Sequence, residues 1–180
     1  QYLPDEETYL FNGFYPEMLD HFTRDSARIA VFVLRGALGW ETARRRFIGT
    51  TVPDAAEPES IRRKLYERKE KLGIPQISAN LNGVHLSAGP LEAVSELLRF
   101  TDDRAGTPPG VLAFPFGKLL GAQFSEEIAT LMLSNPDVAV GDDMVSLFDI
   151  TEELDPPAAL LALQEVQGQF GAGETQSSGL

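Results

Sequence analysis

The sequence predicts an α+β or α/β domain in which helices cover one sheet. The apolar segment Arg28–Leu34 is rich in β-branched residues and has the composition of a strand buried on both faces. A short strand within residues 77–85 ends on His85 and is followed by a helix. The order strand–helix–strand–helix recurs in residues 111–164, which indicates a second set of similar elements.

The composition allows one domain with a sizeable hydrophobic core. The chain has 180 residues, of which 43% are hydrophobic. It contains no cysteine, which excludes disulfides and cysteine-containing metal sites and suits an intracellular location. The longest apolar runs, such as Ile29–Leu34, are too short to cross a membrane, and nothing resembles a signal peptide. We therefore expect no membrane partner.

Three helices are expected in the first half of the chain. Residues 15–22 have the pattern of a short helix, and residues 40–48 that of a second helix, which Gly49 stops. Residues 59–72 have the pattern of a charged helix that ends at Gly73.

The stretch that follows Asn82 contains His85, one of only two histidines. Pro90 fits the first position of the next helix, because its missing N–H would be unpaired there. Glu96 lies on this helix, away from the apolar stripe that predicts its buried face: Val94, Leu97 and Leu98. His85 is thus expected where a strand gives way to a turn and a helix. From spacing alone, a structural histidine bonded to a backbone carbonyl is the commoner case.

Alternating elements are expected in the second half as well. Val111–Phe114 and Met144–Ile150 have the composition of strands. Ser125 is the predicted N-cap of a helix that runs to Leu133, with two glutamates in its first turn. The last helix is expected to open at Pro156 or Pro157 and to end near residue 164.

Two segments have the composition of connecting or flexible chain. Residues 101–110 (TDDRAGTPPG) are rich in turn formers and are the best candidate for a linker. Residues 167–180 are rich in Gly, Ser and Gln, which predicts a flexible tail.

The charge is distributed unevenly. The net charge is −12, yet twelve of the 15 basic residues lie between Arg24 and Lys71. The overall sign argues against a nucleic-acid partner, which would require a broad basic face. The local basic segment would suit a small polyphosphate, although residues 62–71 alone are better explained as a solvated helix face.

Five short motifs occur in one order along residues 15–100. They are the aromatic pair Tyr15 and Phe22, Arg45-x-x-Ile48-Gly49-x-Thr51-x-Pro53, Ile61-Arg62, Asn82-x-x-His85-x-Ser87, and Ala93 with Glu96. The chain thereby resembles the nucleoside diphosphate kinase family, whose segments read Arg-x-x-Leu-Gly-x-Thr-x-Pro, Ile-Arg and Asn-x-x-His-Gly-Ser. The aromatic pair is the loosest of the five matches.

The resemblance implies an α+β, ferredoxin-like (βαββαβ) antiparallel sheet with helices packed on it. It implies transfer of a nucleotide γ-phosphate through a phosphohistidine at His85, with Glu96 on one ring nitrogen and Ser87 close by. Neutral imidazole is a good nucleophile near neutral pH. Other side chains would hold the nucleotide: Arg45, Thr51, Arg62, Asn82, Tyr15 and Phe22. Mg²⁺ would accompany the nucleotide with few or no protein ligands.

Three departures from the family pattern leave a second interpretation open. No Lys-Pro-Asp strand precedes Tyr15, Leu86 stands where the family has Gly, and Ala88 stands where it commonly has Asp. The alternative is a catalytically weak or inactive structural module of a large assembly, such as a ciliary or flagellar axoneme. Arg62, Thr51 and Ser87, taken singly, could be a surface charge, a helix-end bond and a helix cap.

The domain organisation follows from the same comparison. Residues 1–100 would be the kinase-like domain without its first strand, and residues 111–166 a degenerate second half-domain or an unrelated extension. Ala113–Gly117 (AFPFG) faintly resembles the family's opening Ile-Lys-Pro-Asp-Gly. The missing strands could come from sequence before Gln1, from a partner chain, or from Val111–Phe114 and Met144–Ile150 in a permuted sheet.

These expectations have a geometric consequence. One cleft should be lined by His85, Arg45, Thr51, Arg62 and Asn82, and a Glu96 oxygen should lie within hydrogen-bond reach of a His85 ring nitrogen. The expected ligands are nucleoside di- and triphosphates. Protein partners would be those of a larger assembly, and the location the cytoplasm or an axoneme.

Overall fold

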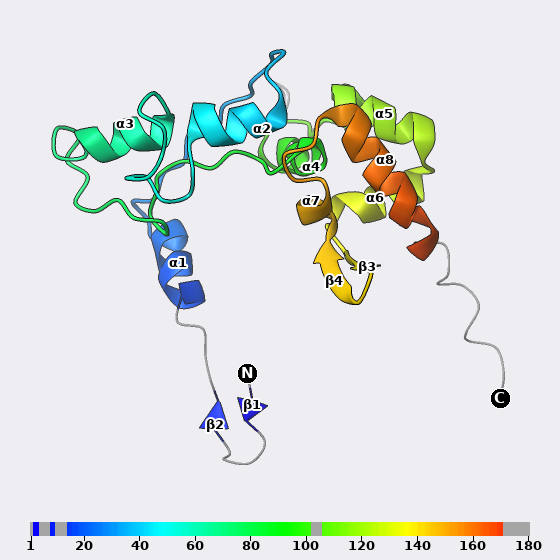
Figure 1. Ribbon diagram of the computed structural model, residues 1–180, viewed down its shortest axis with the longest axis horizontal. Helices are drawn as coiled ribbons and strands as arrows, with labels where there is room; N and C mark the ends of the chain where they lie inside the picture. Colours follow the sequence, from blue (N-terminus) through cyan, green and yellow to red (C-terminus); the bar gives the residue numbers. More distant parts are fainter. Residues whose placement is uncertain (1, 4–7, 10–13, 102–105, 171–180) are drawn as a thin grey trace. The chain divides into compact units, whose positions relative to one another are not determined.

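The computed structural model describes residues 2–3, 8–9, 14–101 and 106–170. The chain divides into two compact units, Gln1–Leu34 and Arg35–Leu180. Helices and two short antiparallel strand pairs make up the described part, so the fold mixes helix and strand (Figure 1). No helix in the described part is long and apolar enough to cross a membrane.

The first unit contains a short strand pair and one helix. Strands β1 (Tyr2–Leu3) and β2 (Thr8–Tyr9) pair in antiparallel register. Helix α1 (Phe14–Thr23) confirms the helix predicted for residues 15–22. Its C-terminal end is closed by Arg24, whose Nη2 donates to the Asp20 carboxylate at 2.8 Å.

The strand predicted at Arg28–Leu34 is not formed. The segment has no strand partner among the described residues, and its side chains are exposed, with Phe32 at 79%. The prediction of a strand buried on both faces was therefore wrong. β-Branched residues favour an extended backbone, but a strand exists only where another strand offers its hydrogen-bonding edge.

The second unit opens with two helical segments. Helix α2 (Trp40–Thr42) runs into the π-helical turn η1 (Ala43–Ile48), which matches the predicted helix 40–48. Gly49 ends it with φ +97°, where a Cβ atom would lie 2.5 Å from Ser60 Oγ. Helix α3 (Ile61–Arg68) is shorter than the predicted 59–72, because Ser60 is its N-cap and accepts from the Arg63 N–H.

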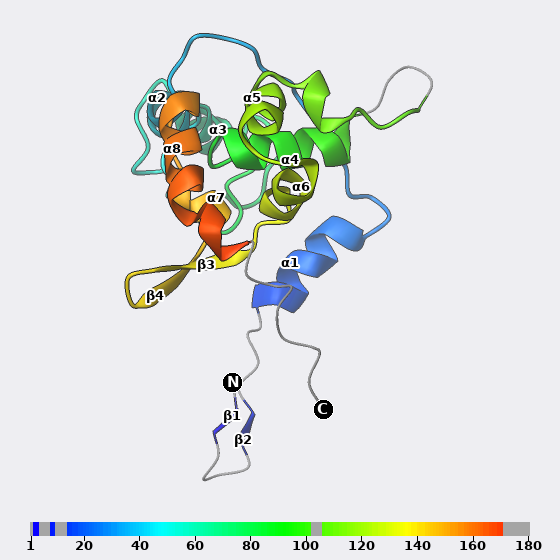
Figure 2. The ribbon, with the colours of Figure 1, turned by 90° about the vertical axis from the view of Figure 1, so that its right-hand side faces the viewer.

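Five helices enclose the hydrophobic core of this unit. They are α4 (Pro90–Phe100), α5 (Pro115–Gln123), α6 (Glu126–Leu133), α7 (Leu147–Ile150) and α8 (Pro156–Val166). Figure 2 shows α4 beside α5 and α6. The core residues without exposed surface are Leu91, Leu120, Met132, Leu147, Ala159 and Leu163. Because α4 packs on α5 and α6, the core does not divide at residues 101–110, where the sequence suggested a linker.

The helix starts agree with the sequence signals. Pro90 occupies the first turn of α4, and Pro156 that of α8. Ser125 Oγ accepts from the Ile128 N–H and caps α6. These signals act within one turn, so distant packing does not override them.

The strands of the second half differ from the prediction. β3 (Asp137–Val140) and β4 (Asp143–Ser146) form a hairpin and pair only with each other among the described strands. Only the first part of Met144–Ile150 is strand, because Leu147 begins α7, and Val111–Ala113 forms the 3₁₀ turn η2. The permuted sheet is therefore wrong.

Residues 77–85 also lack a strand. Gly83 takes φ +76°, and the Ser78 and Leu81 backbones bond each other across a turn. A left-handed residue interrupts the alternation that a strand requires. No ferredoxin-like sheet is formed among the described residues.

Residues 167–170, predicted as part of a flexible tail, are structured. Gln167–Gln169 form the 3₁₀ turn η3, and Gln169 bonds both backbone groups of Ala139 at 2.9 and 3.0 Å. The flexible tail predicted from residue 167 was wrong for these positions. Residues 171–180 lie outside the described part.

Candidate active site

His85 forms a hydrogen-bonded group with the next helix. Its Nε2 lies 2.6 Å from Glu96 Oε1, and Ser87 Oγ donates to the other Glu96 oxygen at 2.5 Å. The predicted hydrogen bond is therefore present. The imidazole is 64% exposed, whereas the Glu96 side chain is 25% exposed, so a rigid carboxylate supports an accessible ring.

The local structure explains this placement. Pro90 starts α4, so that Glu92 and Glu96 lie one turn apart on the same face. Glu92 accepts the Ala88 N–H and thereby fixes the turn before the helix. Gly89 allows that turn to touch the end of α7, because a Cβ atom there would lie 2.2 Å from the Thr151 carbonyl oxygen.

The hydrogen bonds shift the acidity of both partners. The bond to Glu96 holds the pKa of His85 above its ordinary value, although burial acts in the opposite direction. Burial alone would raise the pKa of Glu96, but the bonds from His85 and Ser87 lower it. The imidazole consequently takes a proton more readily than a free histidine, and Glu96 stays ionised.

A cavity of about 340 Å³ lies beside the His85 turn. Its lining comes from η1, the following loop, α3, the His85 turn and the segment after α7: Arg44, Arg45, Ile48, Gly49, Thr50, Thr51, Arg62, Leu86, Glu152 and Glu153. Three predicted nucleotide-binding residues thus share one cavity. His85 and Asn82 do not line it, so the cleft expected to contain all five is formed only in part.

Arg62 holds the chain together rather than pointing free into the cavity. Its Nη1 donates to the Gly49 carbonyl at 2.8 Å, and its Nη2 donates to the Val84 carbonyl at 2.9 Å. Burial, and then the charge of Arg44, lower its pKa. Its Nε is buried without a hydrogen-bond partner among the described residues.

The other predicted binding residues have different surroundings. Arg45 is 62% exposed and bonds Glu153 at 2.8 Å, which raises its pKa. Thr51 is exposed on the loop after η1. Asn82 stabilises its own turn, because its Nδ2 donates to the Ala79 carbonyl at 3.0 Å.

The aromatic pair lies in the first unit. Tyr15 and Phe22 both belong to α1, and Phe22 is 65% exposed. The Tyr15 side chain lies outside the described part.

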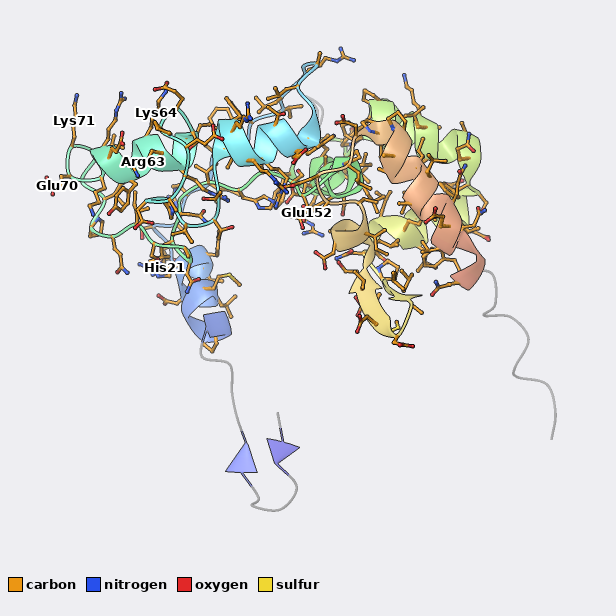
Figure 3. All side chains as sticks on the ribbon, viewed as in Figure 1. His21, Arg63, Lys64, Glu70, Lys71 and Glu152 are labelled. Atoms are coloured by element: carbon orange, nitrogen blue, oxygen red, sulfur yellow. The ribbon has the colours of Figure 1, made fainter. Side chains whose placement is uncertain are left out.

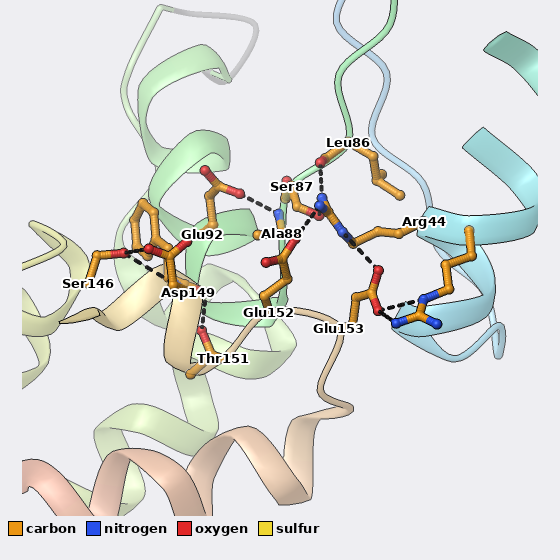
Figure 4. Close-up of polar contacts among 12 residues, drawn as sticks. Arg44, Leu86, Ser87, Ala88, Glu92, Ser146, Asp149, Thr151, Glu152 and Glu153 are labelled. Atoms are coloured by element: carbon orange, nitrogen blue, oxygen red, sulfur yellow. Dashed lines mark hydrogen bonds and ion pairs between the residues drawn. The ribbon is translucent and has the colours of Figure 1, made fainter. Parts of the chain in front are cut away.

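Arg44 is a site residue that the sequence did not single out. Its Nη1 donates to the Leu86 carbonyl at 3.0 Å and reaches the Ser87 carbonyl at 3.4 Å. Its Nη2 pairs with Glu152 (Figure 4). The only signal was a run of three arginines, of which the family motif matched Arg45 alone. The Glu152 partner is 108 residues away and invisible to a local pattern.

Charged side chains of α3 pair with acidic residues close by in sequence. Arg63 bonds Glu67 at 2.6 Å, and Lys64 bonds Glu59, just before the helix, at 2.7 Å. Figure 3 labels Arg63 and Lys64 on α3. The bond to Lys64 lowers the pKa of Glu59. These contacts agree with a solvated helix face and do not add to the cavity.

One group of side chains has ligand atoms close enough for a metal ion. The candidate atoms of His85, Glu92 and Glu96 lie within 4.8 Å of one another. Both carboxylates are already hydrogen-bonded, and Mg²⁺ prefers oxygen ligands to imidazole. This group therefore does not bear on the Mg²⁺ that would accompany a nucleotide.

Comparison of the chain with known protein families, with curated proteins and with solved structures found no match. The feature that bears most directly on function is the exposed imidazole of His85, which is hydrogen-bonded to the partly buried carboxylate of Glu96 close to an arginine-lined cavity.

Proposed function

We propose that the chain is a nucleoside diphosphate kinase-like phosphotransferase that carries a nucleotide γ-phosphate on His85. The hydrogen bond from His85 to Glu96 is the observation that supports this most directly. It occupies Nε2 and leaves Nδ1 without a hydrogen-bond partner among the described residues. An exposed ring nitrogen with a free electron pair is the requirement for a histidine nucleophile.

The proposed reaction has two balanced steps. With its proton on Nε2, His85 attacks the γ-phosphorus through Nδ1, the bond to the bridging oxygen breaks, and the nucleoside diphosphate leaves with the electron pair. A terminal phosphate oxygen of an acceptor diphosphate then attacks the same phosphorus, and the N–P bond breaks. Glu96 accepts the Nε2 proton bond throughout and stabilises the positive charge that develops on the ring.

The cavity supplies the binding groups in this proposal. An arginine guanidinium group can donate hydrogen bonds to two phosphate oxygens at once. In this proposal Arg45 and Arg62 bind phosphate oxygens in this way. Thr51 would donate to a phosphate, and Asn82, which does not line the cavity, would hold phosphate or ribose oxygens. The family resemblance implies Tyr15 and Phe22 as the aromatic residues of the nucleotide pocket. Mg²⁺ bound to the phosphates would neutralise part of their charge.

The reaction would use nucleoside di- and triphosphates as substrates. The family resemblance places such an activity inside the cell, in the cytoplasm or in a ciliary or flagellar axoneme. If the chain is part of a larger assembly such as an axoneme, its protein partners would be the other components of that assembly.

Radiolabelled ATP tests the proposal. Incubation with ATP labelled at the γ-phosphate and Mg²⁺ is expected to give a protein label that acid removes and alkali preserves. Addition of unlabelled nucleoside diphosphate should discharge the label into nucleoside triphosphate. Peptide mapping should place the label on His85 and not on His21, the other histidine. A stable label on Ser87 or on no residue would contradict the proposal.

Glu96→Gln is expected to change the pH dependence of phosphotransfer. The neutral imidazole attacks, so the rate falls as the pH drops through the pKa of His85, which Glu96 raises. Removing the carboxylate charge should move that fall toward lower pH, near the ordinary histidine pKa of about 6.5. The measurement is the labelling rate against pH, checked by NMR titration of the His85 ring.

Glu165→Gln, an exposed change on α8, is the matched control and should leave the profile unchanged. An acid limb at the same pH in wild type and Glu96→Gln would show that the carboxylate does not set the acidity of His85.

A structural module is the second candidate function. Arg62 gives both terminal nitrogens to backbone carbonyls, and Arg45 is paired with Glu153, as expected of arginines that hold a fold together. Absence of any acid-labile label would favour this alternative.

A further inference from the structure

Two carboxylates from the second half of the chain form ion pairs with arginines that line the cavity. Glu152 pairs with Arg44 Nη2, and Glu153 bonds Arg45 at 2.8 Å through both Nε and Nη2. The cavity therefore already contains anions, contributed by a segment more than 100 residues away in sequence. Carboxylate and phosphate oxygens bind guanidinium groups in the same geometry.

The two carboxylates do not satisfy every hydrogen-bond donor of the arginines that line the cavity. Two buried side-chain nitrogens lack a hydrogen-bond partner in the part of the chain that the structure describes, Arg44 Nε and Arg62 Nε. Both belong to residues that line this cavity. Glu153 Oε1 lies 3.7 Å from Arg44 Nε, too far for a hydrogen bond. Because unpaired buried donors are costly, these nitrogens indicate a place for further acceptor oxygens.

The charges of the arginines in the cavity also favour an anionic ligand. Arg44 and Arg62 are close enough that the charge of Arg44 contributes to lowering the pKa of Arg62. A phosphate group has three or more oxygens, whereas a carboxylate has two. An oligophosphate in the cavity would therefore compensate more of this positive charge than the two carboxylates do.

The backbone that carries these two carboxylates is held in place. Glu153 takes φ 58°, which is uncommon for a residue other than glycine, and its N–H donates to the Ala88 carbonyl at 2.9 Å. Thr151 before it is fully buried. The backbone of this segment is thus fixed to the His85 turn, so displacement of the two carboxylates requires rotation of their side chains.

We propose that the cavity is an oligophosphate site, with Arg44 as an additional phosphate-binding residue, and that Glu152 and Glu153 act as its internal competitors. The proposal rests on the proposed function, because it assigns to the same site a control of nucleotide affinity. A ligand must displace the carboxylates before it binds. Its apparent affinity is therefore reduced by the fraction of molecules in which the arginines are free.

Removal of the competing charges tests the proposal. The double variant Glu152→Gln/Glu153→Gln is expected to bind ADP and inorganic tripolyphosphate about tenfold more tightly than wild type by calorimetry. Glu126→Gln/Glu127→Gln removes the same net charge from exposed positions on α6 and is the matched control. We expect its affinity to stay within about twofold of wild type.

Comparison of tripolyphosphate with ADP shows whether the cavity recognises the phosphate chain alone or also requires the nucleoside. Tighter binding of both shows that the phosphate chain alone is recognised, and tighter binding of ADP alone shows that the nucleoside is needed. Equal or weaker binding by the double variant overturns the proposal, as does the lack of binding to any of the three proteins. Both arms are measured on a His85→Asn background, so that failure of phosphotransfer does not affect the result.

A second measurement applies if the double variant does not fold. The side-chain carboxyl NMR signals of Glu152 and Glu153 in the unsubstituted protein should shift as tripolyphosphate is added, whereas those of Glu126 and Glu127 should not. Unshifted Glu152 and Glu153 signals at saturation would overturn the competition.

Discussion

Asparagine in place of His85 is expected to lower phosphotransfer from ATP by roughly 10⁴-fold or more, because no other group replaces a nucleophile that forms the covalent intermediate. Asparagine can still donate to Glu96 and keeps the turn polar. The His85 ring is 64% exposed, so its loss removes little packing. The measurement is single-turnover labelling, with folding followed by circular dichroism.

The matched control is His21→Asn. His21 lies on α1 in the first unit, and its substitution should leave the labelling rate unchanged. An unaltered rate in His85→Asn would dismiss His85 as the nucleophile, whatever the rate of the control variant. Loss of labelling in both variants, with folding retained, would show that the loss is not specific to His85 and would contradict its role as the sole nucleophile.

Helix ends were predictable because their signals are local. Pro90, Ser125 and Pro156 each act on backbone groups within one turn, and each begins the helix that the sequence predicted. The bond between His85 and Glu96 was predicted from the family resemblance, because spacing alone favoured a bond from His85 to a backbone carbonyl. The two residues are eleven positions apart, so one turn and one helix bring their side chains together.

Strands were not predictable in the same way. Arg28–Leu34 has the composition of a buried strand, yet the partner edge that would make it one is a property of other segments. Val111–Ala113 was also predicted as a strand, yet this apolar triplet, two residues before Pro115, forms a 3₁₀ turn. Short apolar runs do not distinguish between these outcomes.

The arginine-lined cavity could be predicted only in part. Arg45, Thr51 and Arg62 were expected together and line one cavity, because η1, its loop and α3 are consecutive in the chain. The acidic partners Glu152 and Glu153 come from the second half, which looked like a separate segment. Their contact depends on how α7 and α8 pack against α4, and no spacing rule describes that packing.

Leu120→Ala is expected to lower the free energy of unfolding by about 2–5 kcal/mol. Leu120 has no exposed surface and lies on α5, which packs on α4, α6 and α8. Truncation would leave a cavity at the centre of this core. Leu119→Ala, on the same helix with the side chain 42% exposed, should cost less than about 1 kcal/mol. Urea unfolding measures both changes.

The same experiment tests whether residues 101–110 divide the second unit. Trp40, the only tryptophan, lies at the start of α2, and its backbone N–H donates to the Asp155 carboxylate before α8 at 2.9 Å. Its fluorescence therefore reports on the start of the unit and on its contact with the segment after residue 110. If one core spans the unit, Leu120→Ala shifts the fluorescence and the circular dichroism transitions together. A Trp40 transition that stays at its wild-type midpoint would show that residues 111–166 unfold as a separate domain.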